Sequence, residues 1–208
     1  MAGPMSLSKS FPLILFFLAC VGCTPLWPGS NRGPMHREIS SLPPGAGCRI
    51  AVLPFLNDSD FPQGGILIQK VFAAQLQSSG EHLLTPEGDI VKAYQQLYLL
   101  PRDTPTLAQL RIIGDRLNAP LLLTGIVLEM REGRSEHQAV NPQMVLELEL
   151  RDPSTGEILW TTLHRRKGTD YNKTMHFGTL HTVTGLSRQM AEEIINLWHE
   201  KGFSQCNE

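Results

Sequence analysis

Seven histidines are the side chains in this sequence best suited to bind a metal or act as a general base. His176 and His181 are five residues apart and follow Asp170, so a hydrolase that uses either histidine with Asp170 is one hypothesis. At this spacing two side chains point to opposite faces of a strand, or lie about 140° apart on a helix, unlike an adjacent i, i+4 ligand pair. Four of the other histidines are isolated in the sequence and are expected to be surface or packed histidines: His82, His137, His164 and His199. The spacing therefore predicts no metal site and no catalytic residues.

Two other patterns are spaced like ligand-binding loops but are incomplete. Asp58, Ser59 and Asp60 lack the glycine and the distal glutamate of a calcium-binding loop. Gly64 and Gly65 precede a predicted helix, but neither a G-x-G-x-x-G pattern nor a Lys-Ser/Thr pair follows them, as a phosphate-binding loop requires. The sequence also has no G-x-S-x-G motif for a nucleophilic serine. We therefore expect no cofactor.

Composition and charge exclude several classes of protein. The chain has 18 lysines and arginines against 20 aspartates and glutamates, a net charge of −2, so it lacks the basic excess of a dedicated nucleic-acid binder. It is 41% hydrophobic and 18% charged, which argues against a polytopic membrane protein and against a fully disordered chain. Its 208 residues predict one folded domain.

The N-terminus has the features of an export signal. Lys9 precedes the apolar run 11–19, and Cys20 follows that run directly. Nine residues are too few to cross a hydrocarbon core of ~30 Å, which needs about 20 residues in a helix. A short apolar segment that ends in small residues is typical of a secretory signal.

The residues Leu18-Ala19-Cys20 resemble the lipobox of bacterial lipoproteins. The resemblance implies that residues 1–19 are removed and that Cys20 becomes an acylated N-terminus. Phe17 stands where that family prefers leucine, which keeps Cys23 as the alternative acylation site. Val21, or Thr24 if Cys23 is the acylated residue, is not the retention residue aspartate, which implies the outer membrane of a Gram-negative cell. There the protein is expected to face the periplasm, although the sequence leaves an outward orientation open. A plain cleaved signal with two incidental cysteines is the other interpretation.

Residues 20–47 are rich in proline and glycine and have no apolar period of 2 or 3.6. We expect a lipidated N-terminus and a flexible tether with a typical span of roughly 25–30 Å. From Cys48 onward the sequence is periodic, so residues 48–208 are expected to form a single domain.

The periodic segments predict an α/β (α+β) domain with a mixed sheet, in the order β-α-β-α-α-β-β-β-α. The continuous apolar run 121–128 indicates a central strand, and the polar residues 131–141 indicate a loop. Met144, Leu146, Leu148 and Leu150 alternate with polar residues and predict one buried strand face. Strands are expected at residues 49–56, 81–85, 121–128, 144–151 and 157–164, and helices around residues 68–76, 86–97, 107–117 and 186–198.

Three phrases of this sequence together resemble one family of envelope domains. They are residues 50–55, residues 117–127 and residues 148–160, and their layout is similar to the periplasmic domain of the secretion lipoprotein CsgG and to the N-terminal domain of TolB. The resemblance implies a non-enzymatic module that binds envelope proteins during assembly or secretion. An oligomeric CsgG-like pore subunit is the alternative, although the extra membrane hairpins that it needs are not evident in the sequence.

Two features outside the apolar pattern are candidates for contacts and cross-links. The segment 170–178 is polar and carries aromatic residues, so it is either a partner-binding loop, with Asp170, Tyr171, His176 and Phe177 as contacts, or a plain connection. Cys48 and Cys206 flank the domain, and in an oxidising compartment they either form a disulfide or remain free thiols.

Overall fold

The computed structural model of the chain describes residues 33–134, 140–173 and 177–203. The predicted acylation sites Cys20 and Cys23 lie outside these residues, as do His176 and Cys206. The described residues all belong to one compact unit, Arg32–Glu208.

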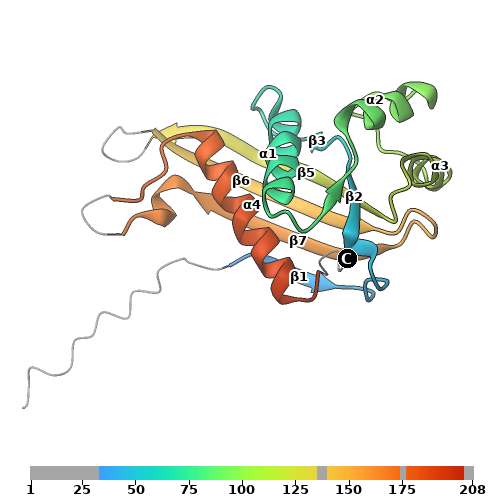
Figure 1. The fold of residues 1–208 in the computed structure, drawn as a ribbon. Helices are drawn as coiled ribbons and strands as arrows, with labels where there is room; N and C mark the ends of the chain where they lie inside the picture. Colours follow the sequence, from blue (N-terminus) through green and yellow to red (C-terminus); the bar gives the residue numbers. More distant parts are fainter. Residues whose placement is uncertain (1–32, 135–139, 174–176, 204–208) are drawn as a thin grey trace, which may run out of the picture. The chain divides into compact units, whose positions relative to one another are not determined.

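One mixed sheet of seven strands organises this part of the chain (Figure 1). The strand order is β1-β7-β6-β5-β2-β4, and β3 pairs with β5. β2 is parallel to β4 and β5, whereas β5, β6, β7 and β1 form an antiparallel series. The strands are β1 Met35–Glu38, β2 Arg49–Val52, β3 Leu56–Asn57, β4 Leu83–Leu84, β5 Leu121–Arg134, β6 Val140–Arg151 and β7 Ile158–Lys167.

Helices cover both faces of the sheet (Figure 1). The helices are α1 Gly64–Ser78, α2 Glu87–Gln96, α3 Leu107–Leu117 and α4 Val183–Glu200, with short 3₁₀ turns η1 Ala46–Cys48 and η2 Gly168–Tyr171. α1 and α4 pack side by side on one face, and α2 and α3 lie on the other. The predicted class is confirmed, because the predicted order recurs as β2-α1-β4-α2-α3-β5-β6-β7-α4, with β1 and β3 added.

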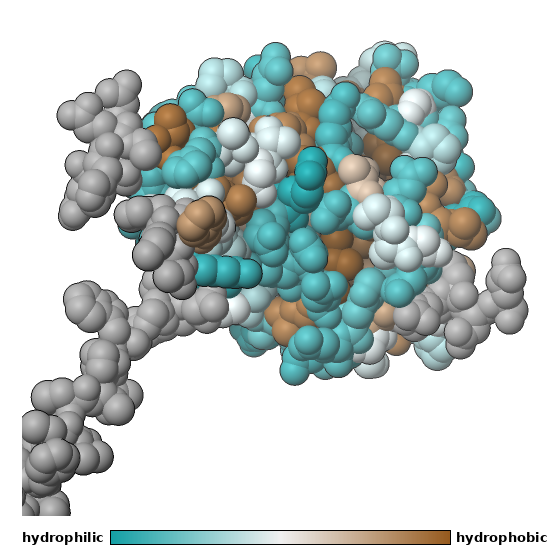
Figure 2. Space-filling model, turned by 60° about the vertical axis from the view of Figure 1, so that its left-hand side comes forward, coloured by the Kyte–Doolittle hydropathy of each residue, from teal (hydrophilic) through white to brown (hydrophobic). Residues whose placement is uncertain are grey.

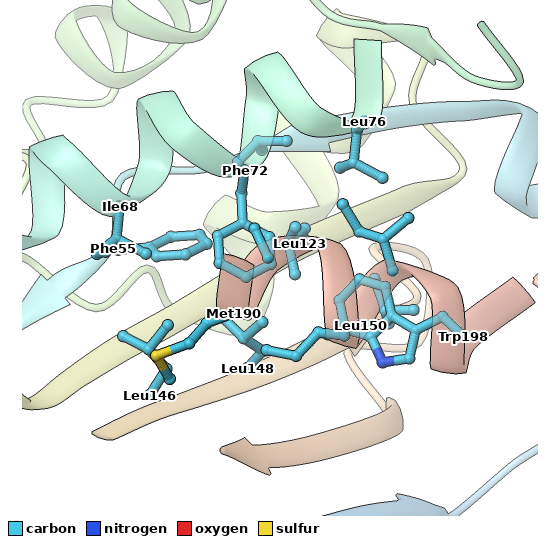
Figure 3. Close-up of a cluster of buried hydrophobic side chains, with 14 of the residues drawn as sticks. Phe55, Ile68, Phe72, Leu76, Leu123, Leu146, Leu148, Leu150, Met190 and Trp198 are labelled. Atoms are coloured by element: carbon cyan, nitrogen blue, oxygen red, sulfur yellow. The ribbon is translucent and has the colours of Figure 1, made fainter. Parts of the chain in front are cut away.

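The larger core lies between the sheet and the pair α1 and α4 (Figure 3). The four alternating side chains of β6, from Met144 to Leu150, are fully buried there, as the sequence pattern predicts. Phe72 from α1 and Met190 and Trp198 from α4 pack against this strand face. Burial of these large apolar side chains is the main favourable contribution to folding on this side.

A smaller core joins α2 and α3 to β2 and to the first residues of β5. Ala51, Leu53 and Leu122 point into it, while Leu121 and Leu123 point into the larger core. β5 is therefore buried on both faces at its start, which explains the continuous apolar run and confirms the predicted central strand. α2 and α3 do not extend over the later part of β5, and this difference creates the candidate site described below.

Two segments differ from the sequence prediction. Residues 131–141 were expected to be a polar loop, but β5 continues to Arg134 and β6 begins at Val140, with Arg131 opposite Gln143. Backbone hydrogen bonds hold this hairpin end, and its exposed side chains can be polar because they pack against no core. Apolar periodicity therefore gives no signal for these strand residues.

Part of the predicted tether also belongs to the sheet. Met35–Glu38 lies within residues 20–47 and forms the edge strand β1, antiparallel to β7, so the structure corrects this part of the prediction. The His36 ring meets the Trp160 ring edge-on at 4.8 Å, and its Nδ1 lies 3.1 Å from Thr162 Oγ1. Met35 itself is 63% exposed, so β1 is held by backbone pairing and by the two contacts of His36, and it shows no apolar pattern.

Hydrophobic and hydrophilic side chains are interspersed on the surface (Figure 2). On the face shown in Figure 2, hydrophobic residues lie in small groups among hydrophilic ones. Among the described helices, none is both long enough and apolar enough to cross a bilayer.

Candidate functional site

The outward face of β5, β6 and β7 lies mostly beyond α2 and α3, because Leu122 is the one residue of these strands among the described buried core residues that the two helices cover. α2 and α3 end over the start of β5, and the β6 side chains that alternate with the buried ones are only partly buried. The face combines apolar and charged side chains, namely Thr124, Ile126, Leu128, Val145, Glu147, Glu149, Thr161, Leu163 and Arg165. Such a mixed, partly exposed sheet face is a common setting for protein contacts.

A groove of about 210 Å³ lies where this face meets the connection between α2 and α3. Sheet residues form its floor and the α2–α3 connection forms its wall. It is lined by Pro54, Leu56, Tyr94, Asp103, Thr104, Pro105, Leu110, Thr124, Gly125, Ile126, Glu147, Glu149 and Arg151. The lining is mostly uncharged, with a few charged groups that can set the orientation of an occupant.

The charges in the groove are predominantly negative. Glu149 pairs with Arg151 at 2.6 Å, and the Asp103 carboxylate accepts a hydrogen bond of 2.7 Å from the Leu100 backbone N–H. Glu147 makes no hydrogen bond or ion pair with another described residue. Burial, together with the Asp103 charge, raises the pKa of Tyr94, so its phenol stays neutral. Three carboxylates against one guanidinium favour an occupant that carries positive charge.

Exposed apolar residues lie on the same connection that forms the groove wall. Tyr98 is 95% exposed and has a φ of 55°, and Leu100 is 49% exposed. A left-handed backbone is uncommon for a residue with a large side chain. Exposed tyrosine beside a groove is typical of contact surfaces, where one aromatic ring supplies a large buried area.

The predicted partner loop is divided by the structure into an anchored part and an exposed part. Asp170 accepts a hydrogen bond of 2.8 Å from the Lys167 backbone N–H, and the ring of Tyr171 lies 5.6 Å from the Arg166 guanidinium. Burial raises the pKa of Tyr171, so this phenol is also neutral. Phe177 is 74% exposed, and His176 lies outside the described residues. Asp170 and Tyr171 thus hold the loop in place, and a contact role for the loop stays a prediction.

Among the described residues, no hydrogen bond joins the histidine and the aspartate of the hydrolase hypothesis. His181 is exposed and its Nδ1 lies 2.9 Å from the Val140 carbonyl, whereas Asp170 caps η2. The two side chains therefore have different hydrogen-bond partners among the described residues.

A buried polar network connects β7 to α4 beneath the predicted loop. His164 and Arg166 are 1% and 3% exposed, and both contact the same Glu193 oxygen, at 2.6 Å from His164 Nε2 and 2.9 Å from Arg166 Nε. Burial alone raises the pKa of Glu193, but the hydrogen bond from His164 and the Arg166 charge outweigh it, so the net pKa is lowered. The carboxylate therefore remains ionised and fixes α4 against the sheet.

Sequence reasoning missed both the groove and this network. The groove depends on where α2 and α3 end over the sheet, which local patterns do not contain. The network had a signal, because His164 and Arg166 alternate with exposed residues on the same strand face as the buried Trp160. Polar residues at the inward positions of a strand indicate a buried, paired network.

Neither a protein-family model nor a curated protein sequence matches this chain. Among solved structures, the fold is similar to that of PelC in a dodecamer from Paraburkholderia phytofirmans, with a TM-score of 0.51 and 17% identity. The match covers 78% of this chain and 96% of that chain. Lipoprotein GNA1162 from Neisseria meningitidis has a TM-score of 0.49 and 17% identity, and the match covers 74% of this chain and 99% of that chain. The C-terminal domain of LpoB from Salmonella enterica has a TM-score of 0.44 and 20% identity, and the match covers 58% of this chain and 82% of that chain. The resemblance to CsgG and TolB stays a prediction, and what the comparison shows is that this chain shares the mixed α+β fold of the PelC subunit.

Proposed function

We propose that this chain is a lipid-anchored, non-enzymatic lipoprotein of the outer membrane that binds envelope proteins in the periplasm. The groove between the sheet face and the α2–α3 connection is the contact site, and its occupant is a protein segment with a cationic side chain flanked by apolar ones. An accessory role in secretion fits such a module. Each part of the proposal has its own support in the sequence or in the fold.

The observation that carries the binding function is the combination of an acidic groove with an exposed tyrosine on the connection that forms the groove wall. Glu147 has no partner among the described residues, while Tyr98 is almost fully exposed on the connection that forms the groove wall. A lysine or arginine of the occupant would pair with Glu147, and apolar neighbours would cover Ile126 and Tyr98. Association through a few such anchors is typical of protein recognition.

The support for the anchor is the sequence around Cys20. A single acyl chain gives only marginal membrane binding, whereas several chains on one cysteine hold a protein stably. We expect mass spectrometry of the mature N-terminus to find an acylated Cys20, and we expect Cys20→Ser to abolish palmitate labelling while Cys23→Ser leaves it intact. Labelling lost only in Cys23→Ser would move the anchor to Cys23. Labelling retained in the double variant would contradict the lipoprotein proposal.

The groove is tested by photo-crosslinking in cells. A photoreactive amino acid at Tyr98 is expected to give a product of defined mass, identified by mass spectrometry as one envelope protein, whereas the same probe at the exposed Arg188 on α4 gives none. Glu147→Lys is expected to reduce the product about tenfold, equivalent to about 1.4 kcal/mol, because it opposes the cation of the occupant. Asp115→Lys on α3 is the matched charge control. A product that is unaffected by Glu147→Lys would contradict binding in the groove.

A second candidate function is self-assembly, including the pore-subunit alternative. It is favoured by the shared fold with PelC, which was crystallised as a dodecamer. The same crosslinking experiment separates the two candidates. A product at twice the mass of this chain supports contacts between copies, and a product with a different protein supports the binding module.

A further inference from the structure

Three potential metal ligands from distant parts of the sequence converge at the end of α4. Glu81 and His82 immediately precede β4, and His199 lies in the last turn of α4. The two imidazole Nε2 atoms are 3.0 Å apart, and Glu81 Oε2 lies 3.2 Å from His199 Nε2. One ligand atom from each of the three residues falls within 4.8 Å of the others. His82 and His199, which are isolated from each other in the sequence, therefore lie next to each other in the fold.

The orientation of His82 is fixed by a backbone carbonyl. Its Nδ1 lies 2.7 Å from the oxygen of Gly47, and its side chain is buried. Because a carbonyl only accepts hydrogen bonds, Nδ1 carries the proton, and in the neutral ring the Nε2 lone pair points toward His199 Nε2, 3.0 Å away. Metal-binding histidines commonly donate their second ring N–H to a carbonyl in this way.

Aromatic packing holds both imidazole rings in place. The ring centroids of His82 and His199 are 5.3 Å apart in a stacked arrangement, and the Phe203 ring lies 4.7 Å from His82 and 6.0 Å from His199. The two Nε2 atoms cannot separate far without disturbing this packing. Zn–N bonds of 2.0–2.1 Å in a tetrahedral site place two nitrogens about 3.3 Å apart, so a small adjustment of the rings suffices.

The remaining side of the cluster opens to a polar hollow. A cavity of about 280 Å³ borders Glu81 and His199 and is lined by Gln75, Ser78, Ser79, Glu192, Ile195 and Asn196. The Glu81 and His199 side chains are 29% and 23% exposed. A cation can therefore reach the three ligands from solvent and keep water at its remaining position.

We propose that Glu81, His82 and His199 form a binding site for a divalent transition-metal cation of the zinc type, with water as the fourth ligand. Two neutral imidazoles and one carboxylate form a donor set that suits Zn²⁺ and neighbouring metals, and harder cations such as Mg²⁺ and Ca²⁺ prefer oxygen ligands. The bound cation would tie the C-terminal turn of α4 to the connection between α1 and β4. The site is separate from the groove proposed for protein binding, and it does not depend on that function.

The test is zinc titration of the mature, untagged full chain in detergent after treatment with a chelator. We expect calorimetry with Zn²⁺ alone to give one equivalent per chain, and His199→Gln to weaken binding by more than about 100-fold, because even outer partners of a metal site change affinity 10–100-fold. Glu81→Gln weakens it less, and His181→Ala, which alters an exposed histidine outside the cluster, leaves it unchanged. Co²⁺ in place of Zn²⁺ is expected to give the visible absorption of a tetrahedral site in the wild type only.

Thermal unfolding distinguishes a variant that is folded but does not bind Zn²⁺ from a variant that does not fold. Zn²⁺ is expected to raise the Tm of the wild type and of His181→Ala but not that of His199→Gln, whose fold is verified by circular dichroism. Absence of binding at millimolar Zn²⁺ would overturn the proposal. One equivalent bound equally by the wild type and His199→Gln would overturn it as well, because the metal would then lie elsewhere.

Discussion

Glu193→Ala is expected to lower the free energy of unfolding by about 3–5 kcal/mol. Glu193 is the carboxylate that His164 and Arg166 share, at 2.6 and 2.9 Å, between β7 and α4. The side chains of His164 and Arg166 are only 1% and 4% exposed, so removal of the carboxylate leaves the guanidinium buried without a counter-charge. Urea unfolding at neutral pH, followed by circular dichroism, measures the change.

Glu192→Ala is the matched control, since Glu192 is the preceding residue of α4 and is exposed. We expect that variant to stay within about 0.5 kcal/mol of the wild type, as surface substitutions usually do. Comparable effects for the two variants would show that the network contributes no more than a surface charge. A loss of less than 1 kcal/mol in Glu193→Ala would contradict the prediction directly.

The pH dependence of stability gives a second readout of the same carboxylate. Because the folded-state pKa of Glu193 is lowered, its contribution is fully present above the ordinary carboxyl pKa and is lost as the pH falls through the lower, folded-state value. The difference in stability between the wild type and Glu193→Gln should therefore shrink as the solution is acidified across that range. A difference that stays constant with pH would assign the effect to packing.

Cys48→Ser is expected to lower the free energy of unfolding by about 4–5 kcal/mol, the value for a disulfide that closes a loop of more than about 100 residues. Cys48 is disulfide-bonded, and its partner lies outside the described residues. We propose Cys206 as that partner. The His82 ring contacts both the Gly47 carbonyl and the Phe203 ring, so Phe203, the last described residue, lies close to Cys48. Three further residues reach at most about 10 Å.

Paired variants test the assignment to Cys206. Cys206→Ser alone and the double variant with Cys48→Ser are each expected to be destabilised as much as Cys48→Ser, because one bond is lost in all three. Reduction of the wild type with dithiothreitol should reproduce the same shift in the unfolding midpoint. A Cys206→Ser protein as stable as the wild type would show that Cys48 has another partner.

The elements of this fold that could be predicted from sequence are those that bury an apolar face. β6 was predictable because Met144 to Leu150 alternate with polar residues, and the start of β5 because it is apolar on both faces. β1 and the far ends of β5 and β6 were not, since they are held mainly by backbone hydrogen bonds, with which any exposed side chain is compatible.

The candidate sites were less predictable because they join residues that are distant in the sequence. His82 and His199 are 117 positions apart in the sequence, and Glu193 is 29 positions from His164, which it contacts. No local spacing rule relates such pairs. The polar residues at inward positions of β7 were the available signal, and that signal identifies buried residues but not their partners.

The outermost strands of the sheet are short, which limits how strands of other chains can pair with them. β1 and β4, which end the sheet on its two sides, have four and two residues, while the long strands β5, β6 and β7 lie inside. The short strands β1 and β4 leave few free N–H and C=O groups of their own to template the addition of a foreign strand, and among the described strands β1 covers β7 only from Trp160 to Leu163. A fragment that begins after Glu38 would lack β1 and leave the backbone of β7 unpaired on its outer side from Trp160 to Leu163, where a strand of another chain could add and start amyloid-like stacking.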